Sequence, residues 1–218
     1  IKLNAASGGG SFSLQAPSSS SNNRVFQLPD SADGTLARTS DIDVVKLANV
    51  NSGSTILNFG LESIDTSIYR MVRLVGGFLT GTDGAIPLFY YKNGSTTLNG
   101  SDYHYAASEH QTGSSSNSTY HGSGAVGIEL TKESGNGNTE GLRLDVSINF
   151  AKSGTDAASA AINNFITFQA MRFNSSGVFR SHNGGGVFKG QQNTDGFMIQ
   201  PHTGQIHDYS YAIYGYKR

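Results

Sequence analysis

The sequence predicts an all-β protein, an antiparallel β-sandwich that follows a short N-terminal segment of paired strands. Apolar and polar residues alternate with a period of two along much of the chain, and clusters of Gly, Asn, Asp and Ser separate the alternating stretches. A length of 218 residues accommodates one large all-β domain with an appendage. We therefore expect a segment over residues 1–45 and a sandwich of jelly-roll or lectin-like type over residues 46–218.

Composition narrows the classes of partner. Only 14% of the residues are charged and the formal net charge is −1, so the chain lacks the basic surface that tracks a phosphate backbone. No apolar run approaches the roughly 20 residues that span a bilayer. The absence of cysteine rules out disulfides and thiolate metal sites. We expect no nucleic-acid partner, no membrane insertion and no cofactor.

The clearest strand covers residues 142–150. Its apolar side chains alternate with polar ones and share one face: Leu142, Leu144, Val146, Ile148 and Phe150. Weaker alternation predicts further strands at residues 67–75, 86–91, 126–130, 165–173, 196–200 and 209–216. The polar segments 92–102, 110–124, 132–141 and 182–196 are rich in Gly, Asn and Ser, and we expect them to be long loops.

Aromatic and polar residues are concentrated between positions 99 and 120, where we expect an exposed loop. An aromatic ring can cover the apolar face of a sugar while polar neighbours bind its hydroxyls. The expected ligand-binding set is Asp102, Tyr103, His104, Tyr105, Glu109, His110 and Tyr120. Tyr is also a good strand former, so the alternative that the three rings pack in the sheet stays open. We interpret four other tyrosines as packed: Tyr90, Tyr91, Tyr211 and Tyr214.

Catalytic and metal sites receive less support. The two carboxylates of a glycosidase would have to come from scattered acidic residues, whose pairing the sequence leaves open: Asp102, Glu109, Glu129, Glu133, Glu140 and Asp145. His104, His202 and His207 lack the tight spacing of metal ligands. The motifs G-x-S-x-G and H-E-x-x-H do not occur. We therefore expect a non-catalytic protein without a metal.

The N-terminal segment, residues 1–45, has too few apolar residues to form a core of its own. Pro17, Pro29 and Gly34 interrupt its short alternating stretches, and an isolated hairpin is marginal in water. We expect an intertwined trimer in which three copies bury their apolar residues against one another: Phe12, Leu14, Val25, Phe26 and Leu28. The chain starts at Ile1 without a secretory signal, which indicates the C-terminal piece of a longer or processed chain.

Residues 8–39, GGGSFSLQAPSSSSNNRVFQLPDSADGTLART, also resemble a known family. They match the segment G-S-x-x-L-x-A-P followed by N-R-x-x-x-L-P-D-x-x-G-T-L, near the shaft-to-tip junction of tail fibres and related virion appendages of tailed bacteriophages, notably marine ones. The remainder, with YRMVRLVGGFLTGTDGAIPLFYYKNGSTT and the closing YAIYGYKR, is similar to the β-sandwich tips of such fibres. The resemblance implies a homotrimeric fibre whose terminal domains contact the host.

By the same resemblance, the protein is a receptor-binding part of the virion that is assembled in the host cytoplasm. It would attach to a host-surface glycan or protein, and join other tail proteins through a part of the fibre that precedes Ile1. No catalytic residue of the family maps onto the chain. Two alternatives stay open, a polysaccharide depolymerase of the tailspike type and a structural head-fibre or capsid decoration protein. A tailspike would carry a long parallel β-helix, and the sequence shows no repeat of fixed period.

Overall fold

A computed structural model describes residues 2–4, 11–13, 43–113, 117–134, 137, 140–150, 164–174, 177–190 and 192–217. The chain divides into two compact units, Ile1–Thr39 and Ser40–Arg218. In the first unit, β1 (Lys2–Asn4) pairs with the antiparallel β2 (Ser11–Ser13), which places Phe12 opposite Leu3. The other expected trimer contacts, Leu14, Val25, Phe26 and Leu28, lie outside the described residues, and the trimer stays a prediction.

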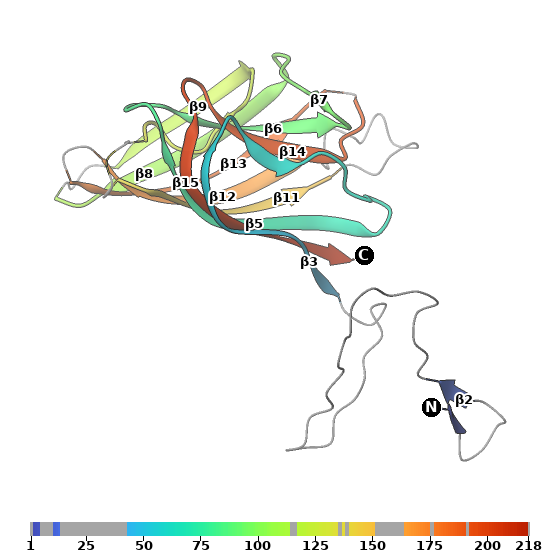
Figure 1. The fold of residues 1–218 in the computed structure, drawn as a ribbon. Coiled ribbons are helices and arrows are strands. Elements are labelled where there is room, and N and C mark those ends of the chain that lie inside the picture. Colours follow the sequence, from blue (N-terminus) through green and yellow to red (C-terminus); the bar gives the residue numbers. More distant parts are fainter. Residues whose placement is uncertain are drawn as a thin grey trace. The chain divides into compact units, whose positions relative to one another are not determined.

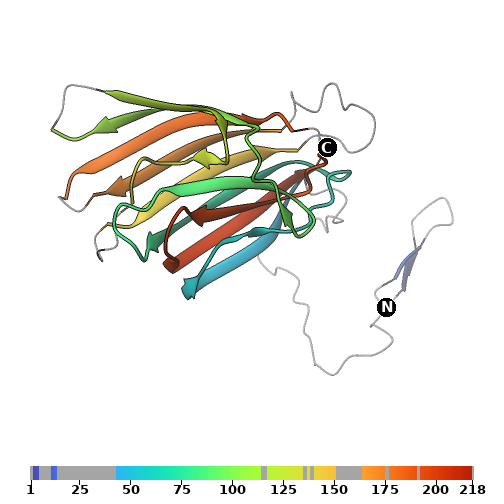
Figure 2. The same cartoon turned by 90° about the horizontal axis from the view of Figure 1, so that it is seen from above.

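The unit Ser40–Arg218 is a sandwich of two antiparallel sheets, drawn with the large sheet below the small one in Figure 1. Figure 2 shows the strands of the large sheet side by side. The large sheet contains eight strands, in the spatial order β3 (Val44–Ile56), β15 (Ile206–Lys217), β5 (Tyr69–Thr80), β11 (Leu142–Asn149), β12 (Phe165–Phe173), β13 (Phe179–Phe188), β8 (Tyr103–Gln111) and β9 (Ser118–Ala125).

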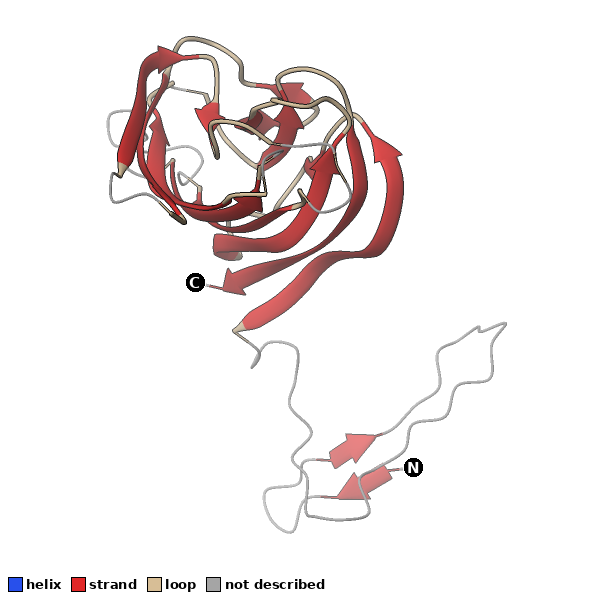
Figure 3. Cartoon of the chain, turned by 90° about the vertical axis from the view of Figure 1, so that its left-hand side faces the viewer, coloured by secondary structure: helices blue, strands red, loops and turns tan. Residues whose placement is uncertain are grey.

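The small sheet contains five strands, and the large sheet curves around it in Figure 3. Its spatial order is β10 (Ile128–Glu129), β6 (Pro87–Asn93), β14 (Gly196–Pro201) and β4 (Phe59–Leu61), and β7 (Thr96–Thr97) pairs with β6. Every element in the described ranges is a strand, and none of these ranges holds a helix that could cross a bilayer. The prediction of an all-β antiparallel sandwich is confirmed.

The core lies between the two sheets and follows the predicted alternation. In β11, the four apolar residues are buried and the polar residues between them are exposed or half-buried. In β12, Ile166, Phe168 and Ala170 are buried in the same alternating manner. Each stretch predicted from alternation contains a strand, which confirms β5, β6, β10, β11, β12, β14 and β15.

Three stretches that we expected to be loops form strands instead. Residues 103–111 and 118–125 form β8 and β9, and the glycine-rich stretch 182–188 belongs to β13. A Cβ atom at Gly184 would lie 2.5 Å from Cβ of Ala107 and 2.6 Å from Cζ of Phe168. Neighbouring side chains therefore fill the space beside Gly184, and this glycine marks a crowded core position rather than a turn.

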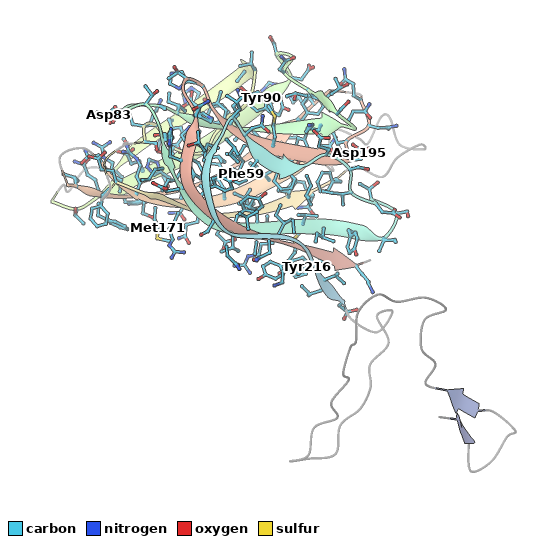
Figure 4. The ribbon with its side chains drawn as sticks, in the orientation of Figure 1. Phe59, Asp83, Tyr90, Met171, Asp195 and Tyr216 are labelled. Atoms are coloured by element: carbon cyan, nitrogen blue, oxygen red, sulfur yellow. The ribbon has the colours of Figure 1, made fainter. Side chains whose placement is uncertain are left out.

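The large sheet has a near end, where the N-terminal part of the chain joins β3 at Val44, and a far end at Ile56. Tyr216 pairs with Val44 at the near end, and Ile206 pairs with Ile56 at the far end. The 13 residues of β3 span roughly 40 Å between the two ends. Figure 4 shows Tyr216 and Met171 on the outer face of this sheet, far apart along it.

Candidate ligand-binding groove

A groove opens at the edge of the sandwich where β4 of the small sheet faces β15 of the large sheet. Its volume is about 290 Å³, close to the lower limit of roughly 300 Å³ for small-molecule sites. It is lined by the aromatic residues Phe59, Tyr209 and Tyr211, by the polar residues Asn58, Glu62 and Lys92, and by apolar residues that include Ile56, Phe197 and Met198. Because Asn58 and Phe59 follow the last residues of β3, the groove lies toward the far end of the sheet.

The aromatic wall of the groove consists of three rings in nearly parallel planes. The centroids of Phe59 and Tyr211 lie 4.8 Å apart with 17° between the planes, and those of Tyr209 and Tyr211 lie 6.1 Å apart with 19°. The planes of Phe59 and Tyr209 differ by 4°. Phe59 is buried between the sheets (Figure 4), whereas both tyrosines are half-buried. The wall therefore consists of one buried ring, Phe59, and two partly accessible tyrosine rings.

A bulge in β15 and a glycine in β3 position Tyr209. Asp208 has a φ of 43°, a left-handed conformation that is uncommon for a residue other than glycine. The register of β15 against β5 shifts there, between His207 and Ser210. Tyr209 pairs with Gly53, where a Cβ atom would lie 2.1 Å from Cζ of the tyrosine ring. The ring thus lies directly on the backbone of β3, in space that only glycine leaves open.

A lysine and a glutamate of the small sheet form an ion pair in the wall of the groove. Nζ of Lys92 donates to Oε1 of Glu62 at 2.8 Å. Gly196 of β14 pairs with Lys92 and has no side chain, so the lysine can reach across β14 toward the end of β4. The side chain of Lys92 is 7% exposed and that of Glu62 is 72% exposed. The pair therefore joins a nearly buried ammonium to a carboxylate in water.

These groups can bind a polar ring compound. Burial raises the pKa of Tyr211, and the neighbouring Tyr209 raises it further, so the phenol stays protonated at neutral pH and can donate a hydrogen bond. Aromatic faces next to amide, hydroxyl and charged groups are typical of sugar sites. Glu62 is the one carboxylate among the described residues of the groove, whereas glycoside hydrolysis requires two.

The tyrosines that we expected to bind ligand are core residues. They lie in β8 and β9 rather than in a loop, and Tyr103, Tyr105 and Tyr120 are 0%, 8% and 3% exposed. The Tyr103 hydroxyl donates to the carbonyl of Leu98 at 2.6 Å and accepts from the backbone N–H of Tyr91 at 2.8 Å. Rings buried in this way cannot stack on a sugar. The expectation of an exposed aromatic loop is wrong, and the packed alternative holds.

The polar members of the expected set point in different directions. Asp102 is half-buried at the near end of β8, where its main-chain carbonyl accepts a hydrogen bond from Lys189. His104 and His110 lie on the outer face of β8, and Glu109 is buried on the inner face. The structure does not bring these side chains together into one site.

Glu109 instead belongs to a buried ionic cluster. Its Oε1 accepts a hydrogen bond from Nη1 of Arg180 at 2.9 Å, and its Oε2 lies 3.6 Å from Nε2 of His182. Arg172, which is also buried, pairs with Arg180 across β12 and β13. Burial lowers the pKa of His182 to about 3, and the charges of Arg172 and Arg180 lower it as well. The histidine is therefore neutral at physiological pH, inside a closed part of the sandwich.

In the described ranges, no three His, Cys, Asp or Glu side chains gather as metal ligands. Comparison of the chain with protein-family models, with curated proteins and with solved structures finds no match. The function is therefore inferred from the groove and from the sequence.

The alternation pattern did not reveal the aromatic wall. We interpreted Tyr211 as a packed strand residue, and it is only half-buried beside the groove. The closing stretch HDYSY had a usable signal, because two tyrosines at alternate positions next to Asp208 share one face of a strand. Phe59 carries no such signal, since its place in the wall depends on contacts with residues about 150 positions later in the chain.

Proposed function

We propose that this protein is a non-catalytic attachment domain of a viral fibre, which binds a sugar of a host-surface glycan in the groove between β4 and β15. The proposal is carried by the three nearly parallel rings of Phe59, Tyr209 and Tyr211 beside polar side chains. The accessible tyrosine faces would cover the apolar face of a pyranose, while Asn58 and the ion pair would contact its hydroxyls.

The position of the groove supports a role in attachment. In a fibre that is held at its N-terminal end, the opposite end of the last domain meets the host. The N-terminal part of the chain joins β3 at Val44, and the groove tyrosines pair with Val50 and Gly53, roughly 20–30 Å along that strand. The fibre itself is inferred from the resemblance of residues 8–39. Several copies on one fibre would strengthen weak sugar binding through avidity.

Two variants of β15 test this proposal. Tyr209→Ala removes a ring of the groove, and Tyr214→Ala removes a half-buried tyrosine on the other face of the same strand. We expect Tyr209→Ala to weaken binding to host cells or isolated surface polysaccharide by about tenfold with little change in Tm, and Tyr214→Ala to retain binding. Shortened polysaccharide products would overturn the non-catalytic assignment. A wild-type protein that binds neither cells nor polysaccharide would overturn attachment and favour a structural virion role.

We also propose that the protein is a homotrimer whose copies meet at the near end of the large sheet. Apolar or aromatic side chains follow one another there across the outer face, interrupted at β11: Val44, Tyr216, Met71, Phe165 and Val187. Val44 lies at the C-terminal end of the segment 1–45 that we expect to trimerise. We expect a second copy to cover this row.

Two phenylalanines on the same face of β12 test the trimer. Phe165 at the near end is 40% exposed and Phe173 at the far end is 44% exposed. We expect Phe165→Glu to shift sedimentation toward monomer at micromolar concentration, because the charge would be buried between copies. Phe173→Glu should leave the trimer intact. A monomeric wild type, or equal behaviour of the two variants, would contradict this arrangement.

A further inference from the structure

We infer that the groove prefers a sugar that carries a carboxylate, such as a uronic acid, and that Lys92 receives this carboxylate in place of Glu62. The inference rests on the proposed function, because it names the class of sugar that the same groove would take. It depends on the burial of Lys92, the exposure of Glu62 and the glycine that lies between them.

Lys92 is prepared to receive an anion before any ligand arrives. Its side chain is nearly buried, and its Nζ lies in an ion pair with Glu62. A buried ammonium requires an anionic or hydrogen-bonding partner. Folding has already buried Lys92 away from water. A ligand carboxylate therefore gains a charge-assisted hydrogen bond without the cost of desolvating the lysine.

Glycine at position 196 lets the end of β4 lie close to β14. A Cβ atom there would lie 2.5 Å from the carbonyl oxygen of Leu61 and 2.7 Å from that of Glu62. A larger residue at this position would therefore collide with backbone. Gly196 also pairs with Lys92, so the close approach of β4 to β14 accompanies the contact between Glu62 and the ammonium.

Glu62, in contrast, can leave. Its side chain is 72% exposed and follows the last residue of β4, Leu61. Water can hydrate this carboxylate when it leaves, and a ligand carboxylate in its place would keep the nearly buried ammonium paired. Glu62 therefore acts as a built-in competitor, and its release into water would accompany the binding of an acidic sugar.

The same asymmetry disfavours other classes of sugar. An amino sugar would have to bind Glu62, whose carboxylate would first have to leave water. A neutral sugar could hydrogen-bond the ion pair through its hydroxyls, but it brings no anion that could replace Glu62 at the ammonium. A carboxylate replaces one anion by another at an ammonium that lines the same groove as the aromatic wall.

Matched ligands test the preference on the full chain. Methyl glycosides of glucose, galactose and mannose would be titrated in parallel with the corresponding uronic acids by calorimetry. We expect an acidic compound to bind about tenfold more tightly than its neutral partner, and this ratio to fall as salt is added. Equal affinities that Tyr209→Ala abolishes would overturn the acidic preference and leave the proposed function in place. Binding by no compound would overturn both.

Variants of the ion pair test the role of each partner. Glu62→Gln removes the competitor at an exposed position, and we expect roughly threefold to tenfold tighter binding of the uronic acid, whereas binding of the neutral sugar should not tighten. Lys92→Met should abolish the preference, and Lys92→Arg, which keeps the charge, should retain it even if the Met variant fails to fold. Glu133→Gln is the matched control, because Glu133 is also an exposed acid beside a buried cation, Arg172. An unchanged or weaker affinity of Glu62→Gln for uronic acids would overturn the inference.

Discussion

The two edges of the sandwich carry similar tyrosine pairs and use them in opposite ways. At the closed edge, formed by β8, β9 and β10, Tyr105 and Tyr120 have ring centroids 6.4 Å apart and are buried. At the open edge, formed by β3, β15 and β4, Tyr209 and Tyr211 have ring centroids 6.1 Å apart and are half-buried beside a groove. The rings themselves are alike, so the difference must lie in what covers them.

A segment after β10 covers the closed edge. The Tyr120 hydroxyl donates to the carbonyl of Leu130 at 3.2 Å, and Nζ of Lys132 lies 5.1 Å from the centroid of the Tyr120 ring. At the open edge the small sheet ends in β4, a strand of three residues that supplies only Phe59 to the aromatic wall. Cover by a distant segment therefore decides whether a tyrosine belongs to the core or to a binding surface.

The largest difference between the edges should appear when one tyrosine is removed from each. We expect Tyr120→Ala to lower the free energy of unfolding by about 3–5 kcal/mol, because it leaves a cavity in a covered core. Tyr209→Ala should lower it by about 1 kcal/mol, since its ring already borders the groove. Urea unfolding measures both. Equal losses would show that the open edge is packed as tightly as the closed edge.

The period-two pattern predicted those strands whose apolar residues face the core, as in β11, because alternation is a local property of the chain. It failed for β13, where Gly184 replaces a core side chain and the stretch looks like a turn. It also failed for β8, whose tyrosines stand beside polar residues. Whether such residues are buried depends on a neighbouring strand that the local sequence does not identify.

The candidate site was predictable only as a residue type. Tyrosines near polar groups also line the candidate groove, but the sequence indicated the pair that β10 and its following segment cover. The groove depends on three non-local facts: the shortness of β4, the bulge at Asp208, and the contact of Tyr209 with Gly53. None of them is a property of one sequence window.

Replacing one acidic residue at each edge should give the next largest difference in the free energy of unfolding. Glu109 lies in the buried cluster of the closed edge, and Glu62 is exposed at the open edge. We expect Glu109→Gln to lower the free energy of unfolding by about 3 kcal/mol, because Arg180 would lose its buried counter-charge. Glu62→Gln should lower it by only about 1 kcal/mol, because the exposed amide oxygen can still accept a hydrogen bond from Nζ of Lys92. Chemical denaturation of both variants provides the check, and a larger loss for Glu62→Gln would reverse the assignment of the edges.

The closed edge should also make stability depend on pH through His182. Its pKa is about 3 in the folded protein and about 6.5 when unfolded, so the unfolded state binds the proton more readily. Stability contributed by the neutral histidine is present above pH 6.5 and is lost as the pH falls toward 3. Of this loss, roughly 2 kcal/mol should occur between pH 6.5 and pH 5. Glu109 faces this ring as an anion, and Arg172 and Arg180 face it as cations.

His182→Gln isolates this contribution. The variant keeps a polar side chain and removes the titrating group, so its unfolding free energy should change less between pH 6.5 and pH 5 than that of the wild type. Most carboxylates titrate below this window. Identical slopes for the two proteins in urea titrations at both pH values would show that His182 is not buried in its neutral form.

Adding a methyl group to a glycine at the open edge should have the smallest effect on stability. It should still have a clear effect on binding. Gly53→Ala would place a Cβ atom 2.1 Å from Cζ of Tyr209, so the ring must move. The ring borders the groove and can swing into it, and we expect a loss of less than about 1 kcal/mol in unfolding free energy. Sugar affinity should fall several-fold, because the displaced ring no longer lies parallel to Phe59.

Gly184→Ala places the same methyl group in β13, the strand beside β8 of the closed edge, where the nearest atoms are Cβ of Ala107, Cζ of Phe168 and the carbonyl oxygen of Ala106. Two of these are fixed by the neighbouring strand, so the sheet itself must yield, and we expect a loss of about 1–3 kcal/mol. Thermal unfolding and sugar titration on both variants separate the edges. If Gly53→Ala binds sugar normally, the position of Tyr209 does not matter for binding, and the aromatic wall is packing rather than a site.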